Sequence, residues 1–339
     1  MTDNGPFPEM NPGFTSSRKG TRNDMKKRLV VVGSINLDLV SVAPRIPLRG
    51  ETLIATSFGT FPGGKGANQA VAAARLGTPV SMIGRLGNDA FGNELRANLQ
   101  SAGVDTAAID VVSTSSGIAQ IITEEKGENV IVVAAGANAQ LTSGYLEKHL
   151  ALIRSSGIVL TQLEIPLETV DYLAAVTRKE NIPLVLDPAP AQPLPSSLLK
   201  GVEWLTPNES ETCSLLGLES QDVPANAMKE IAEILLQRGS RNVLLKLGKR
   251  GCYLALADGR RVFVPAYTVR AIDSTAAGDA FNGAFASALL EGHDPVRCAT
   301  WASAVAAISV TRQGAQPSMP TQPEVHAFLK ERQGTEQPV

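Results

Sequence analysis

Aromatic residues are scarce in this chain, and no long apolar run is present. Only 4% of the 339 residues are aromatic, although 43% are hydrophobic. Without about 18 consecutive apolar residues, a membrane-spanning helix is not expected. The net charge is −2, and basic residues are not interleaved with aromatic ones, so the composition does not favour a nucleic-acid partner.

Cysteine and histidine are also rare and widely separated. The three cysteines, Cys213, Cys252 and Cys298, form no CxxC pair, and an odd number argues against a disulfide framework. The three histidines, at positions 149, 293 and 326, are equally scattered. We interpret all six as packing or surface residues, which fits a reducing cytoplasmic compartment.

The two ends of the chain differ in character from the rest. Residues 1–27 are polar and rich in Pro, Gly, Ser and basic residues, without the apolar stretch of a secretory signal. We expect residues 1–27 to be a disordered extension, with Met25 a candidate true start, and residues 332–339 to be a disordered tail. Residues 28–331 would then fold as one domain.

What the sequence does contain is an alternation of strand and helix patterns. Strands are predicted at 29–32, 80–83, 157–163, 182–186, 202–206 and 242–247, with a hairpin near 251–264. Helices are predicted at 67–76, 90–102, 168–180, 226–238, 278–291, 295–310 and 322–331. This alternation is typical of βαβ units and predicts a doubly wound, mostly parallel α/β sheet.

Two segments interrupt that alternation. Residues 37–61 alternate polar and apolar residues among prolines and glycines, and residues 117–133 contain two β-rich runs around a charged turn. Both patterns predict short antiparallel strands. Together they would form a small sheet that acts as a lid and excludes water from a reaction.

Residues 273–279 form the segment most suggestive of catalysis. At the start of a predicted helix, the backbone amides of Ala276, Ala277 and Gly278 would be unpaired and positively polarised. Such amides stabilise the negative charge of a phosphoryl group during transfer. Asp279 would accept the proton of an attacking hydroxyl, or it would only cap the helix. The segment by itself favours neither interpretation.

A second polar segment is rich in glycine. Residues 63–68 read GGKGAN and match neither a P-loop nor a dinucleotide fingerprint. Lys65 and Asn68 can hydrogen-bond a polyhydroxylated ligand, and the glycines permit close approach to the backbone. The alternative is an ordinary helix entry with a solvated lysine.

Further polar groups directly follow predicted strands, where ligands bind in open α/β sheets. They are residues 33–38, Glu164, residues 206–209 and residues 246–251. Asp38 offers two acceptors to neighbouring sugar hydroxyls, and the Gly-bracketed turn at 246–251 can hold a nucleotide. Each group is equally consistent with an ordinary turn or helix cap.

Taken together, these segments resemble the ribokinase/PfkB family of sugar kinases, and within it the kinases that act on ribose. The resemblance extends over about residues 29–329 and is most specific in GGKGANQA at 63–70 and DSTAAGDAFNG at 273–283. Further matches are GSIN at 33–36 with Asp38, QLE at 162–164, DPAPA at 187–191, TPNE at 206–209 and TRQGAQPS at 311–318.

The resemblance implies a ribokinase-like domain that transfers the γ-phosphoryl group of ATP to O5 of D-ribose, with Mg²⁺ on the phosphates. Asp279 would be the base, and the amides of Ala276, Ala277 and Gly278 the anion hole. The implied ribose ligands are Asn36, Leu37, Asp38, Gly64, Lys65, Gly66, Ala67, Asn68, Glu164 and Asp279. The implied ATP contacts are Asn208, Lys246, Leu247, Gly248, Lys249, Arg250, Gly251, Gly278, Asp279 and Ser303.

The same resemblance implies an activating K⁺ ion beside the anion hole. Its implied carriers are Asp273, Thr275, Ser309, Arg312, Gly314 and Ser318, several through backbone carbonyls. The lids of two subunits would pair as a homodimer. Lys246 and Ser303 depart from the family pattern, since a small hydroxyl residue and a His or Asn, respectively, are common there.

Two other functions remain open from the sequence. One is a related kinase acting on deoxyribose, another sugar or a nucleoside. Few aromatics occur in the lid segments to cover a base, and Asp38 suits adjacent sugar hydroxyls. The other is a catalytically inactive sugar or nucleotide sensor, against which the presence of both Gly278 and Asp279 argues.

Overall fold

The computed structural model describes residues 28–124 and 129–333. The predictions for residues 1–27, for 125–128 of the hairpin turn and for 334–339 of the tail lie outside the described residues. Residues 332 and 333, predicted as part of the tail, instead belong to the last helix. Within the described ranges, no helix is long and apolar enough to cross a bilayer.

A nine-stranded sheet forms the centre of the molecule, in the order β13-β12-β11-β10-β9-β8-β1-β4-β5. Seven neighbouring strands pair in parallel, and only the β11–β12 and β12–β13 pairs, at one edge, are antiparallel. The strands are β1 (Arg28–Val32), β4 (Val80–Gly87), β5 (Asp105–Val112), β8 (Ser156–Thr161), β9 (Leu184–Leu186), β10 (Trp204–Leu205), β11 (Asn242–Lys246), β12 (Gly251–Ala255) and β13 (Arg261–Pro265). The predicted doubly wound sheet and its antiparallel edge hairpin are confirmed.

Strand β5 was not predicted from the sequence. Its burial alternates irregularly, because it is an edge strand with one exposed side and carries Asp105 and Asp110. The fully buried strands gave clearer signals, as in β1, where Leu29 and the three valines that follow it are all inaccessible to solvent.

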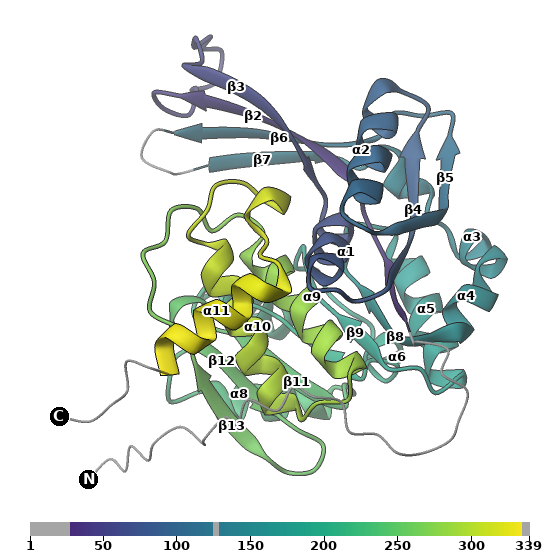
Figure 1. Ribbon diagram of the computed structural model, residues 1–339, viewed down its shortest axis with the longest axis vertical. Helices are drawn as coiled ribbons and strands as arrows, with labels where there is room; N and C mark the ends of the chain where they lie inside the picture. The colour runs from purple at the N-terminus through teal and green to yellow at the C-terminus, as the bar shows by residue number, and fades with distance from the viewer. Residues whose placement is uncertain (1–27, 125–128, 334–339) are drawn as a thin grey trace.

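Helices cover both faces of the central sheet (Figure 1). One face packs against α1 (Lys65–Arg75), α2 (Ala90–Ser101), α9 (Ala277–Leu290), α10 (Pro295–Ser309) and α11 (Gln322–Gln333). The other packs against α3 (Ser143–Lys148), α4 (Leu150–Ser155), α5 (Leu167–Lys179), α6 (Ser196–Leu199), α7 (Glu209–Leu216) and α8 (Met228–Gln237). Short 3₁₀ turns lie at η1 (Gly136–Gln140), η2 (Gly248–Arg250) and η3 (Gln316–Ser318).

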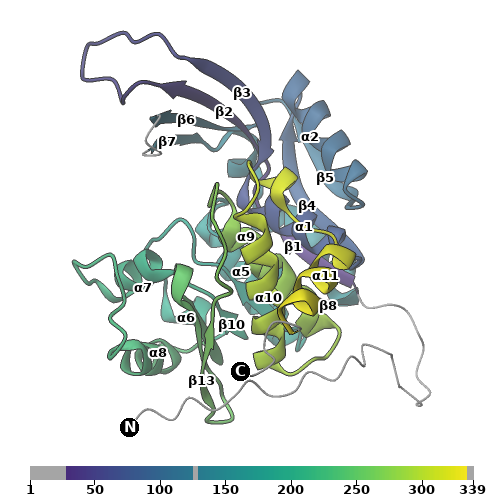
Figure 2. The ribbon, with the colours of Figure 1, turned by 60° about the vertical axis from the view of Figure 1, so that its left-hand side comes forward.

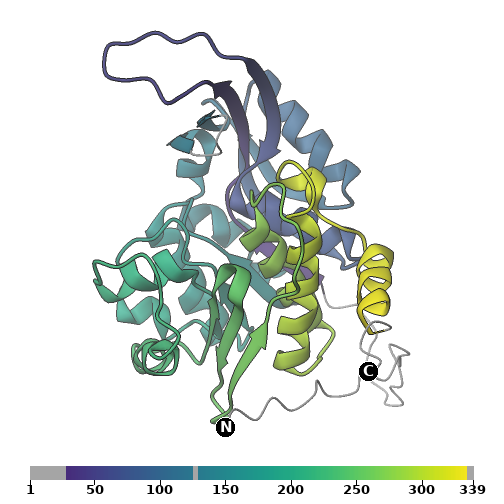
Figure 3. The ribbon, with the colours of Figure 1, turned by 90° about the vertical axis from the view of Figure 1, so that its left-hand side faces the viewer.

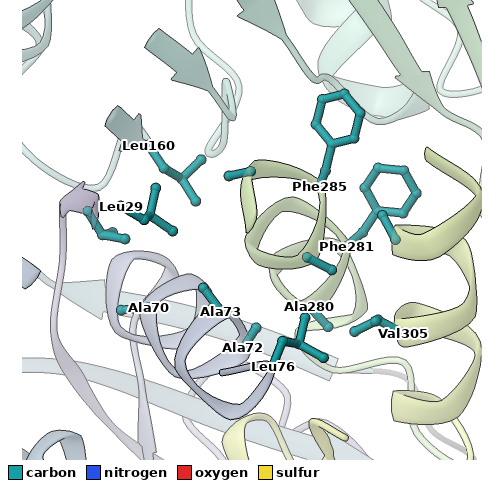
Figure 4. Packing of buried hydrophobic residues seen from close by; sticks show 14 of the residues in the cluster. Leu29, Ala70, Ala72, Ala73, Leu76, Leu160, Ala280, Phe281, Phe285 and Val305 are labelled. Atoms are coloured by element: carbon teal, nitrogen blue, oxygen red, sulfur yellow. The ribbon is translucent and has the colours of Figure 1, made fainter. Parts of the chain in front are cut away.

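Helices α1 and α9 approach each other closely because small residues line their contact. Figure 4 shows Ala72 and Ala73 of α1 facing Ala280 of α9. A Cβ on Gly283 of α9 would lie 2.6 Å from the carbonyl oxygen of Gln69, a distance that only glycine permits. This contact holds the start of α1 beside the start of α9.

A separate four-stranded sheet has the order β3-β2-β6-β7. Its strands are β2 (Asn36–Ala43), β3 (Ser57–Gly63), β6 (Gly117–Glu124) and β7 (Asn129–Ala134). The predicted pairs β2–β3 and β6–β7 are antiparallel, while β2 and β6 pair in parallel and join them. The sheet projects beyond the main domain, as Figures 1 to 3 show from three directions.

Candidate active site

Asp279 lies in the first turn of α9, and its side chain is only 5% exposed. The turn before it is tight, since Ala276 adopts the left-handed conformation with φ 57° and no side chain caps the helix. Among the three amides predicted as an anion hole, that of Ala277 donates to the carbonyl oxygen of Ser274 at 3.2 Å. Gly278 is exposed at the helix start, so its amide is accessible to a ligand.

The Asp279 carboxylate is fixed by two amide side chains of α1. Asn68 Nδ2 donates to Oδ2 at 3.0 Å, and Gln69 Nε2 donates to Oδ1 at 3.0 Å. Burial raises the pKa of Asp279, and the Asp187 carboxylate adds to this, while Lys65 and the two amides oppose it. The group is thus a stronger proton acceptor than an exposed aspartate and is held in one orientation.

Glu164, which follows β8, organises a second set of polar groups. Its Oε2 accepts from the Ser34 hydroxyl at 2.6 Å and from the backbone amide of Lys65 at 3.0 Å. Asn36 Nδ2 lies 3.5 Å from the same oxygen. Asn138 holds Asn36 in turn, since its Nδ2 donates to Asn36 Oδ1 at 2.7 Å.

Asp38 lies on β2 opposite Phe61, close to the start of α1. Burial, together with the Glu164 and Asp279 carboxylates, raises the pKa of Asp38 to about 7. A Cβ on Gly63 would lie 2.2 Å from Asp38 Oδ2, so glycine is required there. Three acidic groups therefore converge on one region, which suits a ligand that offers several hydroxyl donors.

The predicted sugar ligands differ in what they present. Leu37 and Ala67 are buried apolar side chains of the core. A Cβ on Gly64 or Gly66 would clash with the backbone of residues 33–36, at 2.6 Å and 2.7 Å respectively. These four residues shape the floor of the site, while the side chains of Asn36, Asp38, Asn68 and Glu164 supply its polar groups.

A cavity of about 240 Å³ adjoins Asp279. Its lining residues are Lys65, Asp187, Asn208, Glu211, Lys246, Gly248, Ala276, Gly278 and Asp279. Burial lowers the pKa of Lys65, but the Asp279, Asp187 and Glu164 carboxylates outweigh this and raise it above its ordinary value. The cavity therefore holds the charged Lys65 ammonium group next to a helix start, which suits phosphate groups.

The predicted nucleotide residues lie along one side of this cavity or behind it. Asn208 caps α7 through a capping box with Glu211, and burial raises the pKa of Glu211. Of the turn at 246–251, Lys246 and Gly248 line the cavity. Lys249 is exposed, Leu247 is buried in the core, and Arg250 pairs with Glu209. Gly251 has φ 119° where a Cβ would clash with the Val264 carbonyl.

Ser303 lies on α10 and is 7% exposed. Burial raises the pKa of the neighbouring Cys252 thiol to about 12, and the Ser303 side chain partly opposes this. Ser303 therefore lies where α10 packs against β12.

The predicted cation residues gather where the loop after α10 meets the segment before α9. Asp273 Oδ1 accepts from the Thr275 amide and Oδ2 from the Gly314 amide, both at 2.8 Å. These bonds offset the effect of burial and lower the pKa of Asp273. Ser309 and Ser318 donate to backbone carbonyls, and the Arg312 side chain pairs with Glu324. Arg312 can therefore serve a cation only through its backbone.

The possible cation donors in this region are oxygen atoms. Within residues 28–124 and 129–333, no group of three or more His, Cys, Asp or Glu side chains could hold a metal ion. Hydroxyl and backbone oxygens with a single carboxylate are ligands that suit a hard cation.

Four residues around the base were given no role from the sequence. They belong to the family motifs, but their roles follow only from contacts between distant segments: Gln69, Gln162, Asp187 and Gln316. Gln162 Nε2 donates to Gln69 Oε1 at 2.6 Å, and Asp187 accepts from Gln69 at 2.9 Å. Asn138 carried no signal in the sequence, since an Asn in a Gly-Ala-rich turn is unremarkable.

Comparisons with known proteins agree with this geometry. A family model described as pfkB family carbohydrate kinase matches residues 26–322. A ribokinase of Haemophilus influenzae is 41% identical over 307 residues, covering 90% of this chain and 99% of that protein. A ribokinase of Bacillus subtilis is 41% identical over 304 residues, covering 89% and 99%.

Solved structures give the same result. The structure of Arabidopsis thaliana ribokinase complexed with ribose and ATP superposes with a TM-score of 0.84 at 34% identity. The match covers 90% of this chain and 99% of that one.

Proposed function

Because the chain belongs to the pfkB family of carbohydrate kinases, we propose that it transfers the γ-phosphoryl group of ATP to the O5 hydroxyl of D-ribose. The products are D-ribose 5-phosphate and ADP. The proposal rests mainly on the position of Asp279, which Asn68 and Gln69 hold by hydrogen bonds. On one side of it lie hydrogen-bond acceptors suited to sugar hydroxyls, and on the other lies a cavity lined by lysines.

Ribose binds among Asn36, Asp38, Asn68 and Glu164, with Lys65 beside them and the glycines of 63–66 beneath. Asp38 takes two neighbouring sugar hydroxyls, which replace water around its buried carboxylate. The convergence of Asp38, Glu164 and Asp279, expressed in the raised pKa of Asp38, supports a ligand rich in hydroxyl donors. Binding it relieves the electrostatic cost of bringing the carboxylates together.

Asp279 takes the proton of O5 as O5 bonds to the γ-phosphorus and the bond from that phosphorus to the β,γ-bridging oxygen breaks. ADP leaves with the bonding electrons. Burial raises the pKa of Asp279, which favours this role because a stronger base accepts the proton more readily, and the Lys65 ammonium partly opposes the rise. The amides of Ala276, Ala277 and Gly278 stabilise charge on the transferred group. The Ala277 amide must exchange its Ser274 partner to take part.

ATP lies along Asn208, the turn at 246–251 and the start of α9, with Ser303 near the adenine. Mg²⁺ would accompany the phosphates and neutralise part of their charge. Asp273, with backbone and hydroxyl oxygens of Thr275, Ser309, Arg312, Gly314 and Ser318, would hold K⁺. The ion would stiffen the turn that aims the amides.

The four-stranded sheet acts as the lid of the kinase domain, residues 28–331. It also serves as the surface where two copies pair. Exposed apolar side chains support this role: Phe58, Val130, Ile131, Val132 and Val133 are 43–65% exposed. Four of these residues are consecutive on the edge strand β7, and an exposed apolar edge strand is a surface that a second copy can cover. Sedimentation of the full chain should give a dimer, and Val132→Asp should shift it to monomer. We assign the enzyme to the cytoplasm, where its ATP is supplied.

An ATP-coupled assay over pentoses, hexoses and nucleosides tests the substrate. The expected result is the highest kcat/KM with D-ribose. A higher value with deoxyribose or adenosine would replace ribose and keep the family mechanism. No turnover with any sugar, despite tight sugar and nucleotide binding, would instead indicate a sensor.

A further inference from the structure

Lys246 and Asp187 form a buried ion pair beside the cavity. Lys246 ends β11, Asp187 follows β9, and Nζ lies 2.7 Å from Oδ1, with side chains 11% and 2% exposed. Removing two charges from water has a large free-energy cost that offsets their attraction, so such a pair adds little net stability. Its place beside Asp279 points to a use in the reaction.

The ammonium group of Lys246 faces the start of α9. It lies 3.6 Å from the point where a Cβ on Gly278 would stand, and both residues line the cavity. Within the described residues, Asp187 is the one hydrogen-bond acceptor of this ammonium. An ammonium has three N–H donors, so two of them are available to a phosphate in the cavity.

The second oxygen of Asp187 connects the pair to the base. Gln69 Nε2 donates to Asp187 Oδ2 at 2.9 Å and to Asp279 Oδ1 at 3.0 Å. One NH₂ group thus joins both carboxylates. Its orientation is fixed, because Gln69 Oε1 accepts from Gln162 Nε2 at 2.6 Å.

We propose that Asp187 is a positioning residue that holds Lys246 against the transferred phosphoryl group and, through Gln69, holds Asp279 toward the sugar hydroxyl. The inference rests on the proposed kinase activity and adds two roles to it. Lys246 supplies a positive charge beside Gly278, where negative charge develops. Asp187 couples the position of that charge to the position of the base.

The pair also acts on the ionisation of Asp279 through Asp187. The charged groups around the pair and this carboxylate are Lys65, Lys246, Asp187, Glu211, Asp38 and Glu164. The Asp187 carboxylate makes Asp279 harder to ionise, and Lys65 makes it easier. Since Lys246 neutralises Asp187, losing Lys246 alone leaves an unbalanced negative charge beside the base.

Three variants test this with kcat measured from pH 5 to 9. In Lys246→Met, kcat should fall about 100-fold, as for removal of one well-placed donor. The acid limb of the kcat–pH profile, where activity falls as Asp279 is protonated, should move to higher pH. In Asp187→Asn, the limb should move to lower pH and kcat should also fall. In the double variant, the limb should return to the wild-type pH or below, while kcat stays low.

Lys229→Met is the matched control, because this lysine is exposed on α8 away from the cavity, and it should leave both quantities unchanged. Wild-type kcat and an unmoved acid limb in Lys246→Met would overturn the proposal. A merely structural pair would lower the melting temperature without moving the limb.

Calorimetry with ATP alone separates this inference from the substrate assignment. ATP binding should weaken about 10-fold in Lys246→Met whichever sugar the enzyme uses. If the wild type fails to phosphorylate ribose but this loss is seen, the ribose assignment is wrong and the role of Lys246 stands. If ATP affinity and kcat on the true substrate are both unchanged in Lys246→Met, Lys246 does not act on the phosphates.

Discussion

Gln316 donates from Nε2 to Oδ1 of Asn68 at 3.1 Å. The contact joins the loop after α10 to the start of α1, and both side chains are buried. Because Asn68 donates in turn to Asp279, the loop that carries the proposed cation site also steadies the partner of the base. Asn98 holds Gln316 from α2 at 2.5 Å.

Replacing Gln316 tests this connection. In Gln316→Ala, Asn68 Oδ1 loses its donor, so the amide can rotate and present Asp279 with an oxygen instead of a donor. We expect kcat to fall about 10-fold, which corresponds to about 1.4 kcal/mol, with little change in the KM for ribose. Gln322→Ala, exposed at the start of α11, is the control. An equal fall in both variants would point to a general loss of folded enzyme.

Asp279→Asn should abolish proton transfer while keeping the shape of the site. Loss of a general base lowers kcat about 10²–10⁴-fold. Ribose and ATP binding, measured by calorimetry, should persist, because Asn can still accept from Asn68 or Gln69. Full turnover in this variant would rule out Asp279 as the base.

Asp38 should make stability and sugar binding depend on pH in opposite ways. Its pKa rises from 3.8 to about 7 in the folded protein. Between these values the native state binds more protons than the unfolded state, so this residue's contribution to stability falls as pH rises. Asp38→Asn removes the ionised form and should raise the free energy of unfolding, by more at pH 8 than at pH 5.

Urea unfolding at both pH values measures this difference, and an equal gain at both would contradict the shifted pKa. The same variant should lose at least about 10²-fold in kcat/KM for ribose, because sugar hydroxyls lose a charged acceptor. If Asp38→Asn is more stable than the wild type but binds ribose more weakly, Asp38 is a sugar-binding residue rather than a packing residue.

Potassium should activate the enzyme. At matched ionic strength, kcat should be higher in KCl than in NaCl, and Asp273→Ala should abolish the difference. Asp273 holds both the Thr275 and Gly314 amides, so this variant should also lower the basal rate. The same turnover of the wild type in both salts would remove the cation site.

Gly66 should tolerate no side chain. A Cβ there would lie 2.7 Å from the backbone of Gly33 and Ser34, so Gly66→Ala must separate α1 from the turn after β1. Overpacking of this kind costs about 1–3 kcal/mol. Gly144→Ala is the control, since the nearest atom that its Cβ would meet beyond the adjoining backbone of its own helix is Thr142 Oγ1 at 4.0 Å. Thermal unfolding should show a loss for the first variant and none for the second.

Much of the fold could be predicted because buried parallel strands leave continuous apolar runs, as β1 and β11 do. The edge strand β5 was not predicted, because half of its residues face solvent and its sequence therefore resembles that of a loop. The parallel pairing of β2 with β6 was likewise invisible, because it joins two hairpins far apart in the chain.

The sequence alone determined the types of group at the site and their positions at strand ends and helix starts. It determined Asp279 at a helix start, Asp38 after a buried strand, and glycines where the backbone must pass closely. Local patterns suffice for these features, because period, capping and turn chemistry act over a few neighbouring residues.

Only the tertiary structure decided which groups form hydrogen bonds with one another and which charges lie close enough to interact. Gln69 bridging Asp187 and Asp279, Lys246 pairing beside Gly278, and the raised pKa of Asp38 each depend on segments over 50 residues apart. Hydrogen bonds need donor–acceptor distances near 3 Å, and electrostatic interactions weaken with the distance between charges. They are therefore set by the packing of α1 against α9 and the order of the sheet strands, which no local pattern encodes.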